Sequence, residues 1–212
     1  MTSFRFILLC MLVPSVHSAM AAPKPIMPLQ PAELITCLPP TPPNWTLTRS
    51  LAADSFTDGW LTTYAERDFK QDPTTPPVAG PPVIPSTMSI HITDTGFKQN
   101  YKAMFAHPAN DSSANTTLLK VNQFPGSILK IDDKTAILHF LVKDRFLIEI
   151  RATNMAEHDL RKYAESMDCS KLLSVSDTGE TKIPDPVIIS RVDEMNPKNN
   201  RSSPLYWSAP GH

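Results

Sequence analysis

The segment Thr135–Ala152, with the sequence TAILHFLVKDRFLIEIRA, decides the fold. Its first part, Thr135–Val142, is apolar nearly throughout and predicts a central strand covered on both faces. Its second part, Arg145–Ala152, alternates apolar and charged residues, which is typical of a strand with one buried face. Only Lys143 and Asp144 separate the two parts, and so short a turn predicts antiparallel pairing.

Four further segments extend this hairpin into a sheet. Trp60–Phe69 and Met88–Thr93 alternate apolar and polar residues, and each predicts a half-buried strand. Thr117–Phe124 and Ser127–Ile131 predict two more strands, and a polar turn at residues 132–134 leads from them into the hairpin. The sequence therefore predicts an antiparallel sheet of about five to six strands.

Two segments have the periodicity of helices. In the first, apolar residues recur at helical spacing from Phe97 to Phe105, before the helix-breaking His107-Pro108 pair. The second begins at Asn154, which with Glu157 resembles a capping box. Its apolar stripe consists of Leu160, Tyr163, Ala164 and Met167. Two helices packed on one face of the sheet give an α+β fold.

Residues 1–21 have the features of a secretory signal peptide. Arg5 supplies a basic start, Phe6–Val13 is a short apolar run, and Ala-Met-Ala at 19–21 is a cleavage site, with a cut after Ser18 as the alternative. A membrane-spanning helix needs about 20 apolar residues, roughly twice the length of this run. No later segment is long and apolar enough to span a bilayer. The sequence predicts a soluble product that is periplasmic or secreted.

The chain divides into four parts. The signal peptide is followed by a proline-rich arm at 22–43, an α+β domain at 44–174 and a polar, largely disordered tail at 175–212. Proline lacks the N–H donor that helices and sheets need, so the arm is predicted to be polyproline II or irregular. We favour a spacer that lies along the domain over a ligand for an aromatic groove.

Two cysteines remain once the signal peptide, with Cys10, is removed. In an exported protein Cys37 and Cys169 predict a disulfide, because such bonds persist outside the cytosol. The bond would fasten the arm to the end of the second helix. Two separate thiols, or pairing between chains, are the alternatives. A catalytic thiol is not expected, since no histidine lies near Cys37 in the sequence.

Composition and motifs indicate no cofactor, no metal and no nucleic-acid partner. The formal net charge of −1 provides no basic excess for nucleic acid. The histidines lack metal-binding helical spacing, and the six glycines form no phosphate loop. His91 is predicted to be exposed on the sheet, and His139 to be buried and hydrogen-bonded. Asp94 fits a helix cap or turn, and Asp132 and Asp133 fit a turn.

The blocks Ala65-x-Arg67-x-Phe69 and Ile90-x-Ile92-Thr93-Asp94-Thr95-Gly96-Phe97 resemble those of a group of exported, uncharacterised bacterial proteins, over about residues 45–175. The order of elements is also similar to that of PsbP-like domains, which are extracytoplasmic assembly and accessory modules. The resemblance carries over no catalytic residue, and a fold of this kind does not fix a function.

These observations favour a non-enzymatic exported module that binds a protein partner in the cell envelope. The apolar residues Leu205, Tyr206 and Trp207 in the polar tail form a candidate docking peptide, unless they pack back on the domain. The alternative function is a hydrolase or small-ligand enzyme. Its pocket would need to bring together His91, Asp94, Arg67 and Glu149.

Overall fold

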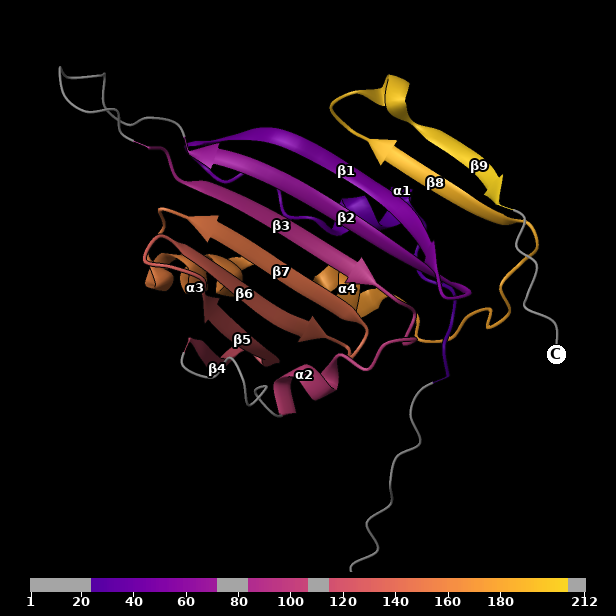
Figure 1. Ribbon diagram of the computed structural model, residues 1–212, viewed down its shortest axis with the longest axis horizontal. Coiled ribbons are helices and arrows are strands. Elements are labelled where there is room, and N and C mark those ends of the chain that lie inside the picture. Colours follow the sequence, from indigo (N-terminus) through magenta and orange to yellow (C-terminus); the bar gives the residue numbers. More distant parts are fainter. Residues whose placement is uncertain (1–23, 72–83, 107–114, 206–212) are drawn as a thin grey trace, which may run out of the picture.

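The computed structural model describes residues 24–71, 84–106 and 115–205, so the predicted signal peptide lies outside the described residues. The described chain forms one antiparallel sheet in the order β4-β5-β6-β7-β3-β2-β1-β8-β9 (Figure 1). The strands are β1 (Trp45–Thr57), β2 (Trp60–Gln71), β3 (Thr87–Asp94), β4 (Thr116–Val121), β5 (Phe124–Lys130), β6 (Thr135–Val142), β7 (Phe146–Thr153), β8 (Val187–Asp193) and β9 (Arg201–Leu205).

The helices that accompany this sheet are all short. They are α1 (Pro31–Leu34), the 3-10 helix η1 (Ile35–Cys37), α2 (Lys102–Ala106), α3 (Glu157–Ser166), α4 (Ser170–Ser174) and the 3-10 helix η2 (Pro197–Asn199). The predicted α+β fold with five to six strands is therefore wrong. The protein is mostly β, with nine strands in the described chain. The sequence indicates a short strand at Pro186–Arg191, where β8 lies, and it missed β1 and β9.

The sequence does not predict strand β1, because the order of its apolar and polar residues is unlike that of a half-buried strand. Its centre, Ser50–Ala53, is buried on successive residues rather than alternate ones. Alanine, serine and aspartate, which are common here, do not favour strands. A register shift between Leu47 and Arg49 adds a bulge that breaks the alternation. Strand β9 lies in the polar segment 175–212, whose composition predicts disorder.

The central hairpin forms as predicted. Strands β6 and β7 pair antiparallel over their whole length. Lys143 and Asp144 both have a φ of 56°, as the central residues of a type I′ turn do, and the N–H of Arg145 donates to the carbonyl of Val142 (3.1 Å). The loop between the paired ends Val142 and Phe146 has three residues rather than the two that the sequence predicts. The prediction that β6 is covered on both faces is wrong, because Ile137 and His139 remain partly exposed.

Both predicted helices are shorter than their periodicity indicates. Helix α2 begins only at Lys102, because Phe97 has a φ of 66° and lies in a turn. Helix α3 begins at Glu157, and Asn154, the expected cap, has a φ of 56° instead. The predicted apolar stripe is buried at Leu160, Ala164 and Met167.

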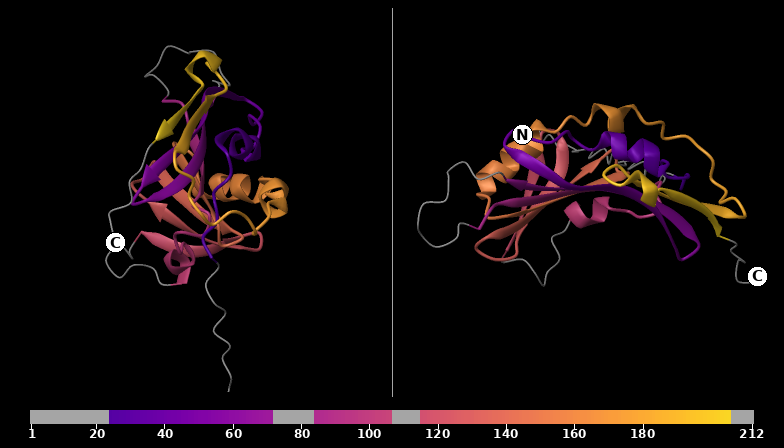
Figure 2. Two further views of the ribbon diagram at one scale, coloured as in Figure 1. Left: turned by 90° about the vertical axis from the view of Figure 1, so that its right-hand side faces the viewer. Right: turned by 90° about the horizontal axis from the view of Figure 1, so that it is seen from above.

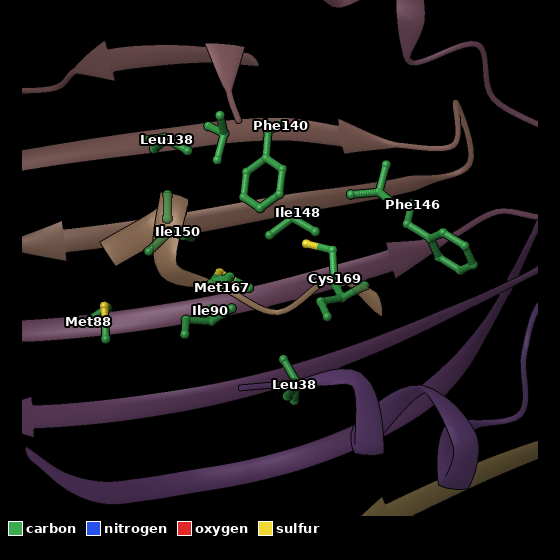
Figure 3. Close-up of a cluster of buried hydrophobic side chains, with 14 of the residues drawn as sticks. Leu38, Met88, Ile90, Leu138, Phe140, Phe146, Ile148, Ile150, Met167 and Cys169 are labelled. Atoms are coloured by element: carbon green, nitrogen blue, oxygen red, sulfur yellow. The ribbon is translucent and has the colours of Figure 1, made fainter. Parts of the chain in front are cut away.

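The sheet and the helices form two layers. Helices α1, α3 and α4 lie on one face of the sheet, and α2 lies on the other side (Figure 2). The core fills the space between the sheet and helices α1, α3 and α4 (Figure 3). Its largest fully buried side chains include Phe69, Met88, Phe140, Phe146 and Ile148. Burial of these apolar groups is the main force that holds the two layers together.

The described part of the arm packs on the domain. Its residues in the core cluster are Leu34, Ile35 and Leu38. The N–H of Ile26 donates to the carbonyl of Gly96, and the N–H of Met27 donates to that of Glu180, both at 2.8 Å. This arrangement fits the interpretation of the arm as a spacer that lies along the domain.

Candidate functional site

A groove of about 520 Å³ lies between the arm and the end of helix α3. One wall is Thr36–Pro43, in which half of the residues are prolines. Lys171 fastens this wall by donating from Nζ to the carbonyl of Thr36 (2.7 Å). Because proline has no N–H, the wall offers apolar rings and carbonyl oxygens. The opposite wall consists of Tyr163, Ser166, Met167, Asp168 and Lys171.

Arg67 supports the proline wall from below. Its Nη1 donates to the carbonyls of Leu38 (3.2 Å) and Pro39 (2.8 Å). Its Nε donates to Oγ of Ser50 (3.0 Å), and its Nη2 pairs with Glu194 (2.6 Å). The Arg67 side chain is only 15% exposed. One guanidinium thus joins β1, β2, the arm and the residue that follows β8.

Tyr163 contributes an unusual polar group to the groove region. Its hydroxyl is buried and has no hydrogen-bond partner among the described residues. Burial raises the pKa of Tyr163 to about 12, although the nearby Arg67 acts in the opposite direction. A buried hydroxyl without a partner loses its hydrogen bonds to water on folding.

We expect Tyr163→Phe to raise the free energy of unfolding by about 1 kcal/mol, because it removes a buried hydroxyl that has no partner. Urea unfolding at neutral pH measures the change. Ser166→Ala is the matched control, since the Ser166 hydroxyl already donates to the Tyr163 carbonyl (2.7 Å) and its loss brings no gain. A loss of stability in Tyr163→Phe would contradict the interpretation.

The two cysteines of the predicted disulfide belong to the same layer. Both are free thiols in the structure: Cys37 is half-buried at the groove and Cys169 is buried. Figure 3 shows Cys169 among the apolar side chains of the core. Burial raises the pKa of Cys37 and raises that of Cys169 to about 11. Protonated thiols are poor nucleophiles. The disulfide stays a prediction.

Acidic residues and histidines alternate across the sheet face opposite α1, α3 and α4. The strand register aligns Glu66, His91, Glu149 and His139 in one row. His139 is hydrogen-bonded, as predicted, with 2.9 Å between its Nε2 and Oε2 of Glu149, but it is partly exposed rather than buried. His91 is half-buried rather than exposed, and its ring meets Tyr64 edge-on at 5.4 Å between centroids. The Nε2 of His91 is buried without a partner among the described residues.

The row predicts a pH-dependent stability that depends on His91. Burial lowers the pKa of His91 below 6.5, against the raising effects of Glu66, Glu149 and Asp68. As the pH falls through about 6.5, the unfolded chain takes up a proton at His91 that the folded chain resists. The free energy of unfolding should therefore fall by up to about 1.4 kcal/mol per pH unit from this group alone.

Urea unfolding between pH 7.5 and 5.5, chosen to bracket this ordinary histidine pKa, measures the effect. We expect His91→Gln to flatten the slope relative to the wild type. The exposed His158 provides the control, since His158→Gln should leave the contribution of His91 intact. The pKa of Glu149 is lowered chiefly by its hydrogen bond with His139, so its contribution is lost only below about pH 4.5, outside this window. Equal slopes in wild type and His91→Gln would contradict the prediction.

The four residues required for the alternative enzyme do not converge. Arg67 and Asp94 project toward the helices, as their contacts with the arm show. His91 and Glu149 lie in the row on the opposite face, because side chains alternate across a strand. The sheet itself separates the two pairs.

Asp94 instead belongs to a buried structural cluster. It accepts two hydrogen bonds from Arg145, at 2.9 and 2.7 Å. It also accepts the N–H of Gly96 (2.8 Å), as predicted for a turn, and that of Leu29 in the arm (2.9 Å). Arg145 donates in addition to the carbonyl of Ser176 (2.8 Å). The ion pair thus joins the sheet to the arm and to the chain that follows α4.

The remaining sequence predictions concern a turn and the tail. Asp132 accepts the N–H groups of Lys134 and Thr135, which confirms its role in the turn. Leu205 is the last residue of β9 and is 39% exposed. Tyr206 and Trp207 lie outside the described residues, so the docking peptide stays a prediction.

No family model, curated protein or solved structure matches this chain. The resemblance to exported, uncharacterised bacterial proteins and to PsbP-like domains therefore stays an expectation. The three described ranges contain no group of three or more His, Cys, Asp or Glu side chains that could hold a metal ion. None of the helices in those ranges is long and apolar enough to cross a membrane. The arm groove is the concave site that the geometry favours, and the sequence missed it because its walls are about 130 residues apart in the chain.

Proposed function

We propose that this protein is an exported, non-enzymatic binding or assembly accessory whose partner docks in the arm groove. The observation that carries the proposal is the groove itself. Its walls are mostly apolar, and Arg67 and Lys171 hold the proline wall in place. Ligand sites combine apolar walls with few polar groups in this way.

The chemistry of the walls indicates the kind of partner. The prolines between Pro39 and Pro43 offer rigid apolar rings, and Met167 adds a deformable thioether. Neither supplies a proton donor or a nucleophile. An extended protein segment that inserts an apolar side chain between the walls fits this surface, and the carbonyls of the proline wall would accept its N–H groups.

A photo-crosslinking side chain at Thr41, which is exposed in the proline wall, tests the proposal. The same group at Thr181, exposed outside the groove, is the control. In envelope extract we expect adducts at Thr41 alone, competed by unlabelled protein and mapped by mass spectrometry to an apolar segment. Equal labelling at both positions, or none at Thr41, would overturn the proposal.

A blocking variant gives an independent measurement. Thr41→Arg places a long charged side chain in the proline wall, and we expect it to weaken binding of the captured segment by about tenfold or more. Thr181→Arg carries the same substitution outside the groove and should bind as the wild type does. Unfolding of both variants should match that of the wild type, because both positions are exposed.

The enzyme alternative makes a different prediction. It requires turnover of ester, phosphate, glycoside or peptide substrates that His91→Gln or Glu149→Gln abolishes. The separation of Arg67 and Asp94 from His91 favours the binding function instead. Turnover that depends on His91 would support the enzyme and contradict the accessory.

Export and maturation belong to the proposal as well. We expect the mature chain to begin at Ala22, with the cut after Ala21. Mass spectrometry of protein recovered from the periplasm or medium tests the cut and the Cys37–Cys169 bond together, since a disulfide lowers the mass by two hydrogens. Retention of the full chain inside the cell would contradict export.

A further inference from the structure

Three cationic side chains meet at the η2 end of the β8–β9 hairpin. Arg191 and Arg201 are paired directly opposite each other in the antiparallel register. Lys198 lies in the η2 turn that joins the two strands. Like charges directly opposite in a sheet destabilise it. The hairpin therefore carries a repulsion that its own fold does not require.

These cations line a pocket of about 430 Å³ that is separate from the arm groove. Its walls contain no carboxylate: they consist of Arg191, Lys198, Asn199, Asn200 and Arg201. Among the described residues, none of the three cations forms an ion pair. The Nε of Arg191 is buried and has no hydrogen-bond partner there.

The carboxylate closest along the chain does not resolve the repulsion. Asp193 accepts hydrogen bonds from the N–H groups of Met195 and Asn196 and from Nδ2 of Asn199. Arg191 helps to lower the pKa of Asp193, yet the two form no ion pair. Asp193 thus stabilises the turn, and its attraction to Arg191 offsets the repulsion only in part, without a direct ion pair.

We infer that this pocket binds a phosphate-type oxyanion. A planar guanidinium binds two oxygens of one phosphate through parallel N–H groups, and two arginines side by side can share it. Lys198 adds a mobile point charge, and Asn200 fixes the turn by accepting the N–H of Asp193 (2.6 Å). The bound anion would remove the Arg191–Arg201 repulsion and so stabilise the hairpin.

The oxyanion could be free phosphate or the headgroup of an anionic lipid, and both present the same chemistry. Met195, which is 52% exposed in the same turn, adds an apolar side chain beside the cations. Inorganic phosphate is the first probe, with chloride at equal ionic strength as its reference. Vesicles of phosphatidylglycerol, with phosphatidylcholine vesicles as the reference, are the second.

Arg191→Gln/Arg201→Gln removes the two opposed charges. Lys162→Gln/Lys182→Gln is the matched control, because both lysines are exposed and lie elsewhere on the surface. We expect the site variant to weaken binding of at least one probe by about tenfold or more, and the control to bind as the wild type does. Loss with phosphate identifies a free-anion site, and loss with vesicles alone identifies a headgroup site. Equal binding by both variants to both probes would overturn the inference.

A second variant separates the binding role from a purely structural one. Arg201→Glu should abolish anion binding and yet raise the melting temperature in phosphate-free buffer, because it places a carboxylate opposite Arg191. If the arginines only supported the fold, the same variant would lower the melting temperature. Stabilisation without loss of anion binding would also contradict the inference.

Discussion

Asp94→Ala is expected to lower the free energy of unfolding by about 3–5 kcal/mol, because it leaves a buried guanidinium without its partner. The side chains of Arg145 and Asp94 are 2% and 0% exposed. The substitution also leaves the N–H groups of Leu29 and Gly96 without their acceptor. Chemical denaturation followed by circular dichroism measures the loss.

A double variant tests whether the loss comes from the uncompensated charge. In Asp94→Ala/Arg145→Met both charges are gone, so the penalty for an unpaired buried cation disappears. We expect the double variant to be more stable than Asp94→Ala alone. Additive losses would mean that each residue contributes through separate packing rather than through the ion pair.

Gly96→Ala is expected to cost about 2–5 kcal/mol, from left-handed backbone strain together with overpacking against the arm. Gly96 has a φ of 55°, and a Cβ there would lie 1.7 Å from the carbonyl oxygen of Ile26. The arm must shift to make room. Hydrogen exchange should therefore show faster exchange at Ile26 than in the wild type.

Gly179, which lies outside the arm but also faces Ile26, supplies a control. A Cβ on Gly179 would lie 3.7 Å from Cβ of Ile26, which is an ordinary van der Waals contact. Gly179→Ala should leave stability unchanged or raise it by about 0.4–1 kcal/mol, by restricting the unfolded chain. If both alanine variants lost stability equally, the close contact at Gly96 would not be the cause.

The sequence predicted those elements whose side chains alternate cleanly. Strand β3, where Met88, Ile90 and Ile92 are buried, and the β6–β7 hairpin were found because period and turn agree. Strand β1 was missed because its buried centre consists mostly of small residues with low strand propensity, such as Ser50, Ala52 and Ala53, and the neighbours on both sides supply the pairing. Strand β8, with Val187, Ile188, Ile189 and Val192, was indicated in part by its apolar residues. Strand β9 is short and mostly polar, so only its pairing with β8 reveals it.

The candidate sites were harder to predict than the fold. The Ala65-x-Arg67-x-Phe69 block is recognisable in the sequence, but nothing local shows that the Arg67 guanidinium contacts Pro39 and Glu194. The Arg191–Arg201 pair becomes visible only once the register of the hairpin is known. Sequence periodicity reports which face a residue occupies, and it does not report which distant segment covers that face.

The position of β1 between β2 and β8 has a consequence for how the chain folds. The Ser50 hydroxyl donates to Glu194, which lies 144 residues further along the chain. One edge of β1 therefore stays open until nearly the whole chain is available, and closing such a long loop carries a large entropic cost. High contact order of this kind slows folding. We expect β8 and β9 to join last, with refolding slower than in proteins whose neighbouring strands are all consecutive.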